Sequence, residues 1–170
     1  MTINSFHKKL VAGCGPERLG NSWVEKTRTE CAIKCLTRSY SYGNESTYAA
    51  YFNTYKQFAD AQAACRCLGG HLFVAKTVAK FDLFRYIVNS TGYVWIGLND
   101  IQVEGKFVWV DDGQEIDPVV KTTIFATYQP DNWLGYSNCA YGSIWGGSFV
   151  LDDAPCDNWA VVVCEKPACT

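Results

Sequence analysis

The stretch on which the fold depends reads YVWIGL and covers residues 93–98. A short apolar run of this kind, rich in aromatic and β-branched side chains, is typical of a buried strand. A second run, KFVWV at residues 106–110, also predicts a strand, and the Asp-Asp-Gly sequence at 111–113 that ends it is a turn signal. From residue 93 onward the chain is therefore predicted to consist of strands and loops.

Upstream of this stretch the apolar spacing changes to that of helices. Residues 55–68 predict a helix that stops at the glycine pair 69–70, and residues 78–88 predict a second one. The stripe of the first helix follows intervals of three, four and three and comprises Phe58, Ala61, Cys65 and Leu68. Residues 48–52 and 71–75 predict short strands.

Downstream of residue 110 a long polar stretch, residues 111–138, has little periodicity. Loops of that length in a compact domain are usually functional or disordered. Three short strands are predicted after it, at residues 139–144, 148–151 and 159–165. The whole order predicts an α+β domain with two helices, antiparallel β-sheets and a long binding loop.

We place this domain at residues 47–170, after a cysteine-containing N-terminal extension of residues 1–46. Within the extension, residues 27–37 predict a short helix with Cys31 and Cys35 on one face. The sequence contains no internal repeat and no low-complexity segment.

Charge is nearly balanced, with 15 Lys and Arg against 17 Asp and Glu. This leaves no basic field for nucleic acid and no polybasic run for a membrane surface. No apolar run approaches the ~20 residues of a membrane-spanning helix. The first 13 residues contain no apolar signal-peptide core, so a secreted form is expected to have lost its leader.

Nine cysteines in 170 residues indicate disulfides and a secreted, extracellular protein. Zinc is disfavoured because no Cys-x-x-Cys occurs and the chain has only two histidines. Sequons at Asn44 and Asn89 agree with a secreted glycoprotein. Because nine is odd, at least one thiol is free or joins two chains as a disulfide-linked homodimer. The pairing of five cysteines stays open: Cys14, Cys31, Cys35, Cys67 and Cys169.

Oxygen-bearing side chains gather in two separate segments near the end of the chain. Gln129 and Asp131 flank Pro130, and a cis bond before the proline would let both side chains face one point. About twenty residues later Asp152 and Asp153 precede a cysteine. An all-oxygen set with up to three negative charges suits Ca²⁺ better than Mg²⁺. The alternative is that Gln-Pro-Asp is an ordinary loop triplet and Asp-Asp a turn cap.

Together these features resemble the C-type lectin family over residues 48–166. The matching motifs, in the family's order, are AQAAC (61–65) with GGHL (69–72), WIGL (95–98), FVW (107–109) with Asp112-Gly113, Gln129-Pro130-Asp131, Asn138-Cys139, Asp152-Asp153 with Cys156, and Val163-Cys164-Glu165. The resemblance implies disulfides Cys65–Cys164 and Cys139–Cys156, and a binding protein that is not an enzyme.

The resemblance also implies that one calcium ion is shared with a sugar. Two vicinal hydroxyls would coordinate the ion and bond to Gln129, Asp131 and Asp152. Family members with Gln-Pro-Asp tend to bind galactose or N-acetylgalactosamine, because amide and carboxylate are exchanged relative to the mannose type. The implied partners are galactose-type glycans on glycoproteins or cell surfaces. Trp133 is expected to stack on the sugar, with packing of that tryptophan inside the loop as the alternative and Tyr136 and Trp145 as rival platforms.

Two positions depart from the family pattern. Ser137 stands where the family usually carries Glu, and Asp152 replaces the Asn of its Trp-Asn-Asp triplet, so the net charge of the site is roughly kept. The family's auxiliary calcium site maps onto two carboxylates and two amides, Asp100, Glu104, Asn132 and Asn138. The alternative for the two carboxylates is a solvated turn.

Two functions are alternatives to that of a lectin. The first is a binding module without sugar, such as an antifreeze or mineral-binding protein on the same fold. The second is a hydrolase, for which the sequence has no Gly-x-Ser-x-Gly motif, and His71 has no nucleophile near it in the sequence. Adjacent carboxylates on a strand also point to opposite faces, which disfavours a glycosidase dyad at Asp152 and Asp153.

Overall fold

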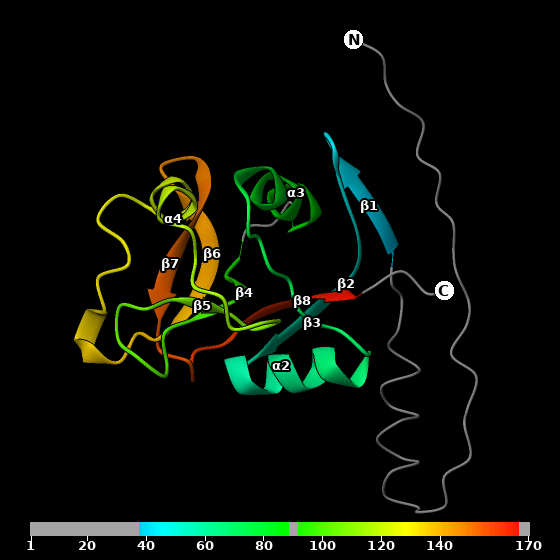
Figure 1. The fold of residues 1–170 in the computed structure, drawn as a ribbon. Coiled ribbons are helices and arrows are strands. Elements are labelled where there is room, and N and C mark those ends of the chain that lie inside the picture. Colours follow the sequence, from blue (N-terminus) through cyan, green and yellow to red (C-terminus); the bar gives the residue numbers. More distant parts are fainter. Residues whose placement is uncertain (1–37, 89–91, 167–170) are drawn as a thin grey trace, which may run out of the picture.

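The computed structural model describes residues 38–88 and 92–166. The predicted α+β class is confirmed (Figure 1). None of the helices in these ranges has the length and apolar composition needed to cross a membrane. The elements are β1 (Arg38–Tyr42), β2 (Glu45–Lys56), α2 (Phe58–Cys67), β3 (His71–Leu72), α3 (Val78–Val88), β4 (Val94–Asn99), β5 (Val108–Trp109), α4 (Pro118–Ile124), the 3-10 helix η1 (Trp133–Gly135), β6 (Cys139–Trp145), β7 (Ser148–Ala154) and β8 (Ala160–Lys166).

The described strands form one eight-stranded sheet in the order β1-β2-β8-β4-β6-β7, with β3 paired to β8 and β5 to β4. The named strands pair antiparallel as predicted, except at the centre, where β4 and β8 run parallel, with Val94 beside Val161. The reason is the connection after β7: residues 155–159 lead back along the sheet, so β8 starts beside the start of β4.

Strand β4 lies between two apolar layers, which explains why YVWIGL has no polar alternation. Successive side chains of a strand point to opposite faces. Trp95 therefore packs with the α2 layer and Ile96 with the α3 layer, and the two helices cover opposite sides of this part of the sheet (Figure 1). Gly97 is required because a Cβ there would lie 2.6 Å from a methyl carbon of Val110 and 2.9 Å from the carbonyl oxygen of Leu72.

Helix α2 begins three residues later than predicted, at Phe58. Tyr55 and Lys56 instead continue β2, opposite Val161 and Ala160 of β8. The predicted stripe of α2 is confirmed, because all four of its residues are buried: Phe58, Ala61, Cys65 and Leu68. The Cys65–Cys164 disulfide is present and ties this helix to β8.

The polar stretch 111–138 was predicted to be a long loop with little periodicity. It contains one α-helix. Helix α4 occupies Pro118–Ile124, and the Asp117 carboxylate caps it by accepting hydrogen bonds from the backbone N–H groups of Val119 and Val120, at 2.8 and 3.1 Å. Proline at the first helical position and an aspartate before it are a helix-start signal. The sequence itself therefore contains a signal for the start of α4.

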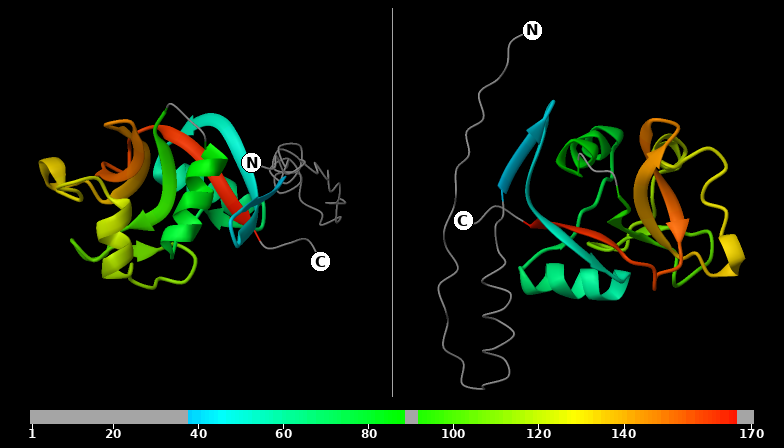
Figure 2. Two further views of the ribbon diagram at one scale, coloured as in Figure 1. Left: turned by 90° about the horizontal axis from the view of Figure 1, so that it is seen from above. Right: turned by 180° about the vertical axis from the view of Figure 1, so that it is seen from behind.

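Strand β1 pairs with β2 from Arg38 to Tyr42, so residues 38–46 belong to the same sheet as the domain. The predicted helix at 27–37 lies outside the described residues, and the domain boundary at residue 47 stays a prediction. The β1–β2 hairpin and η1 lie at opposite ends of the molecule (Figures 1 and 2).

Candidate functional site

The predicted carboxylates lie on the β6–β7 hairpin. In this ladder Asp152 is opposite Tyr141 and Asp153 is opposite Ala140. We expected the two carboxylates at a strand end, but β7 continues through Ala154. The Cys139–Cys156 disulfide is present and joins the start of β6 to the residues after β7. It therefore holds together the end of the hairpin that bears both carboxylates.

Asp153 connects this hairpin to the long loop. Its Oδ1 accepts a hydrogen bond from the backbone N–H of Asp131 at 2.9 Å, and its Oδ2 accepts one from Asn132 at 2.7 Å. The Asp131 carboxylate in turn accepts from the N–H of Trp133 at 3.1 Å. The Gln129-Pro130 peptide bond is cis. The two segments that sequence analysis singled out thus meet in space.

The side-chain oxygen of Gln129 is buried and has no hydrogen-bond partner. A buried acceptor without a donor costs free energy, because it has given up water and gained nothing. A bound group that needs an oxygen ligand would relieve that cost. The orphaned oxygen is thus an observation that favours a cation at this place.

The electrostatics of the carboxylates point the same way. Burial, together with the nearby carboxylates of Asp153 and Asp131, raises the pKa of Asp152 to about 6. Burial also raises the pKa of Asp153, although the backbone N–H groups of Asp131 and Asn132 oppose that shift. Two buried carboxylates and a third beside them are stabilised when a cation binds.

An all-oxygen set of one amide and three carboxylates fits a hard, irregularly coordinated ion such as Ca²⁺. Within residues 38–88 and 92–166, no group of three or more His, Cys, Asp or Glu side chains is arranged to hold a metal ion by itself. Both oxygens of Asp153 are turned towards loop N–H groups. Among the described residues the carboxylates alone do not form a metal site, and the unpartnered Gln129 oxygen is a further candidate ligand.

The residues predicted for an auxiliary cation site are brought close in part. Asp100 is buried, one of its carboxylate oxygens has no partner, and its backbone N–H donates to the carbonyl of Asn138 at 3.1 Å. Burial raises the pKa of Asp100, and nearby Glu104 adds to the shift. The Asn132 side-chain oxygen, by contrast, accepts from the N–H of Ser137 at 3.0 Å. The four-residue auxiliary site stays a prediction, in which the Asn132 oxygen already accepts one hydrogen bond, as both Asp153 oxygens do.

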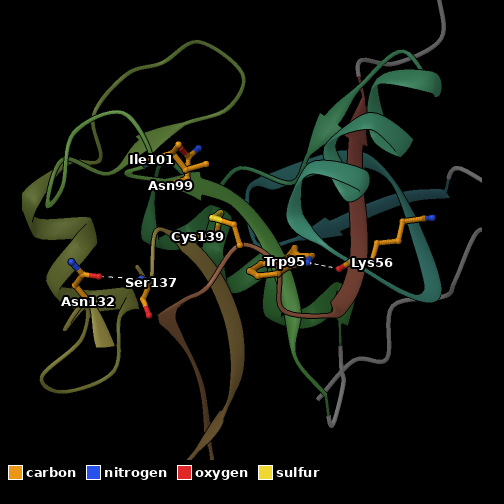
Figure 3. The surroundings of a disulfide bond; sticks show 8 residues. Lys56, Trp95, Asn99, Ile101, Asn132, Ser137 and Cys139 are labelled. Atoms are coloured by element: carbon orange, nitrogen blue, oxygen red, sulfur yellow. Dashed lines mark hydrogen bonds between the residues drawn. A yellow bond between two sulfur atoms is a disulfide. The ribbon is translucent and has the colours of Figure 1, made fainter. Parts of the chain in front are cut away.

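Ser137, the position that departs from the family pattern, secures the loop. Its backbone bonds to Asn132, and its hydroxyl donates to the carbonyl of Trp133 at 2.8 Å. Figure 3 shows Asn132 and Ser137 facing each other, with Cys139 close to Ser137. From the sequence, Ser137 could be recognised only as a position that lacks the family's carboxylate. No sequence signal predicts its two hydrogen bonds.

The aromatic side chains on the loop are exposed. Trp133 is 64% and Tyr136 51% accessible. Trp145 is equally accessible, at 53%, but lies at the tip of the β6–β7 hairpin opposite Ser148. At about 3.3 Å per residue, it is roughly 13 Å along the strand from the level of Asp152. Trp133 and Tyr136 are therefore the better-placed platforms.

The described domain is thus a disulfide-linked α+β fold in which a loop of oxygen-bearing side chains lies beside exposed aromatic rings. The chain belongs to the C-type lectin family: the model of the lectin C-type domain matches residues 54–166. This is a carbohydrate-binding family without enzymatic activity. The matched region begins inside β2, so the β1–β2 turn precedes it.

One curated relative is similar in sequence, and two solved structures are similar in fold. The alpha-N-acetylgalactosamine-specific lectin of Patiria pectinifera is 32% identical over 124 residues, 66% of this chain and 70% of that protein. The carbohydrate-recognition domain of the mouse scavenger receptor C-type lectin superposes with a TM-score of 0.63 at 24% identity, covering 78% of this chain and 97% of that one. A Ca²⁺-dependent type II antifreeze protein has the same fold, with a TM-score of 0.62 at 23% identity over 75% of this chain and 97% of the other.

Proposed function

We propose that this protein binds galactose or N-acetylgalactosamine through a calcium ion held by Gln129, Asp131, Asp152 and Asp153. The observation that carries the proposal is the buried, unpartnered oxygen of Gln129 beside a loop clasped to Asp153. When bound, the ion supplies open coordination positions for two neighbouring sugar hydroxyls. The protein contributes hydrogen-bond donors and acceptors around those hydroxyls.

The choice of galactose over mannose rests on polarity. The Gln129 amide can donate a hydrogen bond, whereas an ionised Asp131 can only accept one. Exchanging the two groups reverses the pattern that a sugar hydroxyl pair meets. The similarity to a lectin whose name states specificity for alpha-N-acetylgalactosamine supports the same preference. Trp133 supplies an exposed ring for the apolar face of the sugar.

The natural ligands would be galactose-type glycans on glycoproteins or cell surfaces, met outside the cell. Two disulfides and an exposed sequon asparagine, Asn44, support an extracellular location. Cys67 is exposed and makes no disulfide with another described residue, which leaves it for a bond to a cysteine outside the described ranges or for a link between two chains. Such a dimer would raise avidity, because single sites of this size bind in about the millimolar range.

The test is affinity chromatography of the purified protein on galactose-agarose in millimolar Ca²⁺. Retention with release by EDTA supports the proposal, and parallel columns of mannose-agarose and underivatised agarose control for selectivity and for non-specific adsorption. Absence of retention in calcium, combined with shaping of ice crystals, would favour the antifreeze type of function instead. Retention that survives EDTA would contradict the role assigned to the ion.

A further inference from the structure

Tyr141 lies directly opposite Asp152 in the β6–β7 ladder. Residues opposite one another in an antiparallel pair project their side chains to the same face and interact. Burial and then the nearby Asp152 carboxylate raise the pKa of Tyr141, so its hydroxyl lies close to that carboxylate. Tyr141 is thus the group on β6 that reaches a predicted ligand on β7.

Two aromatic side chains hold the ring of Tyr141 in place: Trp95 of β4, and Tyr93, which directly precedes that strand. It packs edge-to-face on Tyr93, with centroids 4.8 Å apart, and on Trp95 at 5.9 Å. Trp95 is itself fixed, because its indole N–H donates to the carbonyl of Lys56 at 2.7 Å (Figure 3) and its ring meets Phe58 at 5.3 Å. The position of the Tyr141 hydroxyl is therefore set by the aromatic side chains that pack against α2.

We propose that Tyr141 is a positioning residue, whose hydroxyl donates to one oxygen of Asp152 and leaves the other directed to the bound ion. The inference rests on the proposed calcium-dependent function. A donor that fixes the orientation of a ligating carboxylate typically contributes a factor of about 10–100 in metal affinity.

The need for such a donor follows from the chain's own departure from the family pattern. Asn at position 152 would carry two N–H donors of its own, whereas an ionised Asp has none and lies near Asp131 and Asp153. A neutral hydroxyl stabilises the ionised carboxylate without adding charge.

The experiment is calorimetric titration of calcium into wild type, Y141F and Y93F at neutral pH. Each substitution removes one hydroxyl from one of two adjacent rings, and of the two tyrosines Tyr141 is the one opposite Asp152 in the β6–β7 ladder. We expect Y141F to weaken calcium binding about tenfold and Y93F to leave it unchanged. The thermal unfolding midpoint in EDTA, measured for all three proteins, reports any loss of packing.

A double-mutant cycle with D152N separates positioning from a general effect on the fold. The amide still offers an oxygen to calcium and no longer needs the tyrosine donor, so Y141F should have little effect in the D152N background. An equal loss in both backgrounds would show that Tyr141 acts through packing and would overturn the inference. If D152N binds too weakly to titrate, the comparison of Y141F with Y93F decides.

The possible failures are distinguishable. Wild-type protein without measurable calcium binding overturns the proposed function and this inference together. Wild type that binds calcium with an affinity equal to that of Y141F overturns only the role of Tyr141.

Discussion

The carboxylate of Asp153 accepts a hydrogen bond from the backbone N–H of Asp131 at 2.9 Å, across 22 positions of sequence. Its second oxygen accepts from the next residue, Asn132. One side chain of β7 therefore orients the turn that carries the Gln-Pro-Asp triplet. This contact holds the loop beside β7, because residues 126–132 form no helix or strand of their own.

Replacing Asp153 with Ala should consequently do more than remove a calcium ligand. Two partly buried N–H groups lose their acceptor, which typically costs about 1–3 kcal/mol in unfolding free energy. Urea unfolding in EDTA, where no ion contributes, measures this loss. D157N is the matched control, because Asp157 is an exposed carboxylate close by in the sequence. Equal stability of D153A and D157N would show that the clasp contributes nothing in solution.

Exchanging the polar groups of the triplet should move sugar preference. In the double variant Q129E/D131N, the carboxylate stands before Pro130 and the amide after it, so each sugar hydroxyl meets the opposite polarity. We expect retention to shift at least partly from galactose-agarose to mannose-agarose. Calcium titration serves as the control, since one amide and one carboxylate are kept. Galactose selectivity that persists in a calcium-binding variant would show that the polarity argument is wrong.

Calcium binding should weaken in mild acid, and the sign follows from Asp152. Its folded-state pKa of about 6 lies above the ordinary value of 3.8, so without calcium the folded protein binds this proton more readily than the unfolded chain. Stability of the calcium-free protein from this group is therefore greatest below pH 4 and declines as the pH rises through 6. Calcium competes with the same proton, so its affinity falls below pH 6.

The measurement is the difference in thermal midpoint between calcium and EDTA, at pH 7.5 and at pH 4.5. The difference should be positive at the higher pH and close to zero at the lower one. Sugar retention should be lost over the same interval. An undiminished calcium effect at pH 4.5 would contradict the ligand role of Asp152.

Local periodicity accounts for what the sequence predicted well. Helix α3 begins and ends at the predicted residues, Val78 and Val88, because its apolar spacing is uninterrupted. The buried stripe of α2 was predictable for the same reason. The two disulfides came only from the resemblance to a family, since the spacing of nine cysteines does not determine their pairing.

What the sequence did not predict depends on contacts between distant segments. The parallel pairing of β4 with β8 is decided by the path of residues 155–159, and no local pattern encodes it. The hydrogen bonds of Asp153 to the loop and the pairing of Tyr141 with Asp152 likewise join residues that only the folded chain brings together. Helix α4 differs, because its start signal, Asp117 before Pro118, is present in the sequence, but its seven residues are too few to show a clear apolar period.

Asn44 is expected to carry an N-linked glycan when the protein passes through a secretory pathway. It lies with Gly43 in the two-residue turn between β1 and β2, and both Asn44 and the sequon hydroxyl residue Ser46 are exposed. Mass spectrometry of the peptide containing Asn44, before and after enzymatic deglycosylation, measures occupancy. N44Q and S46A should both abolish it. Because this hairpin lies at the opposite end of the molecule from η1 (Figure 2), galactose retention should be the same in both variants.

Trp133 should separate sugar binding from calcium binding. The ring is exposed on the loop beside the clasped triplet, and its contribution would come from contact with the apolar face of the sugar. W133A is expected to weaken galactose binding about tenfold, equivalent to ~1.4 kcal/mol, while calcium affinity is unchanged. Trp145 offers a matched control, because it is similarly exposed but lies at the far tip of the hairpin. Calorimetry with both ligands measures the two affinities. A loss in Y136A and none in W133A would move the stacking role to Tyr136, and equal losses in W133A and W145A would rule out a specific platform on the loop.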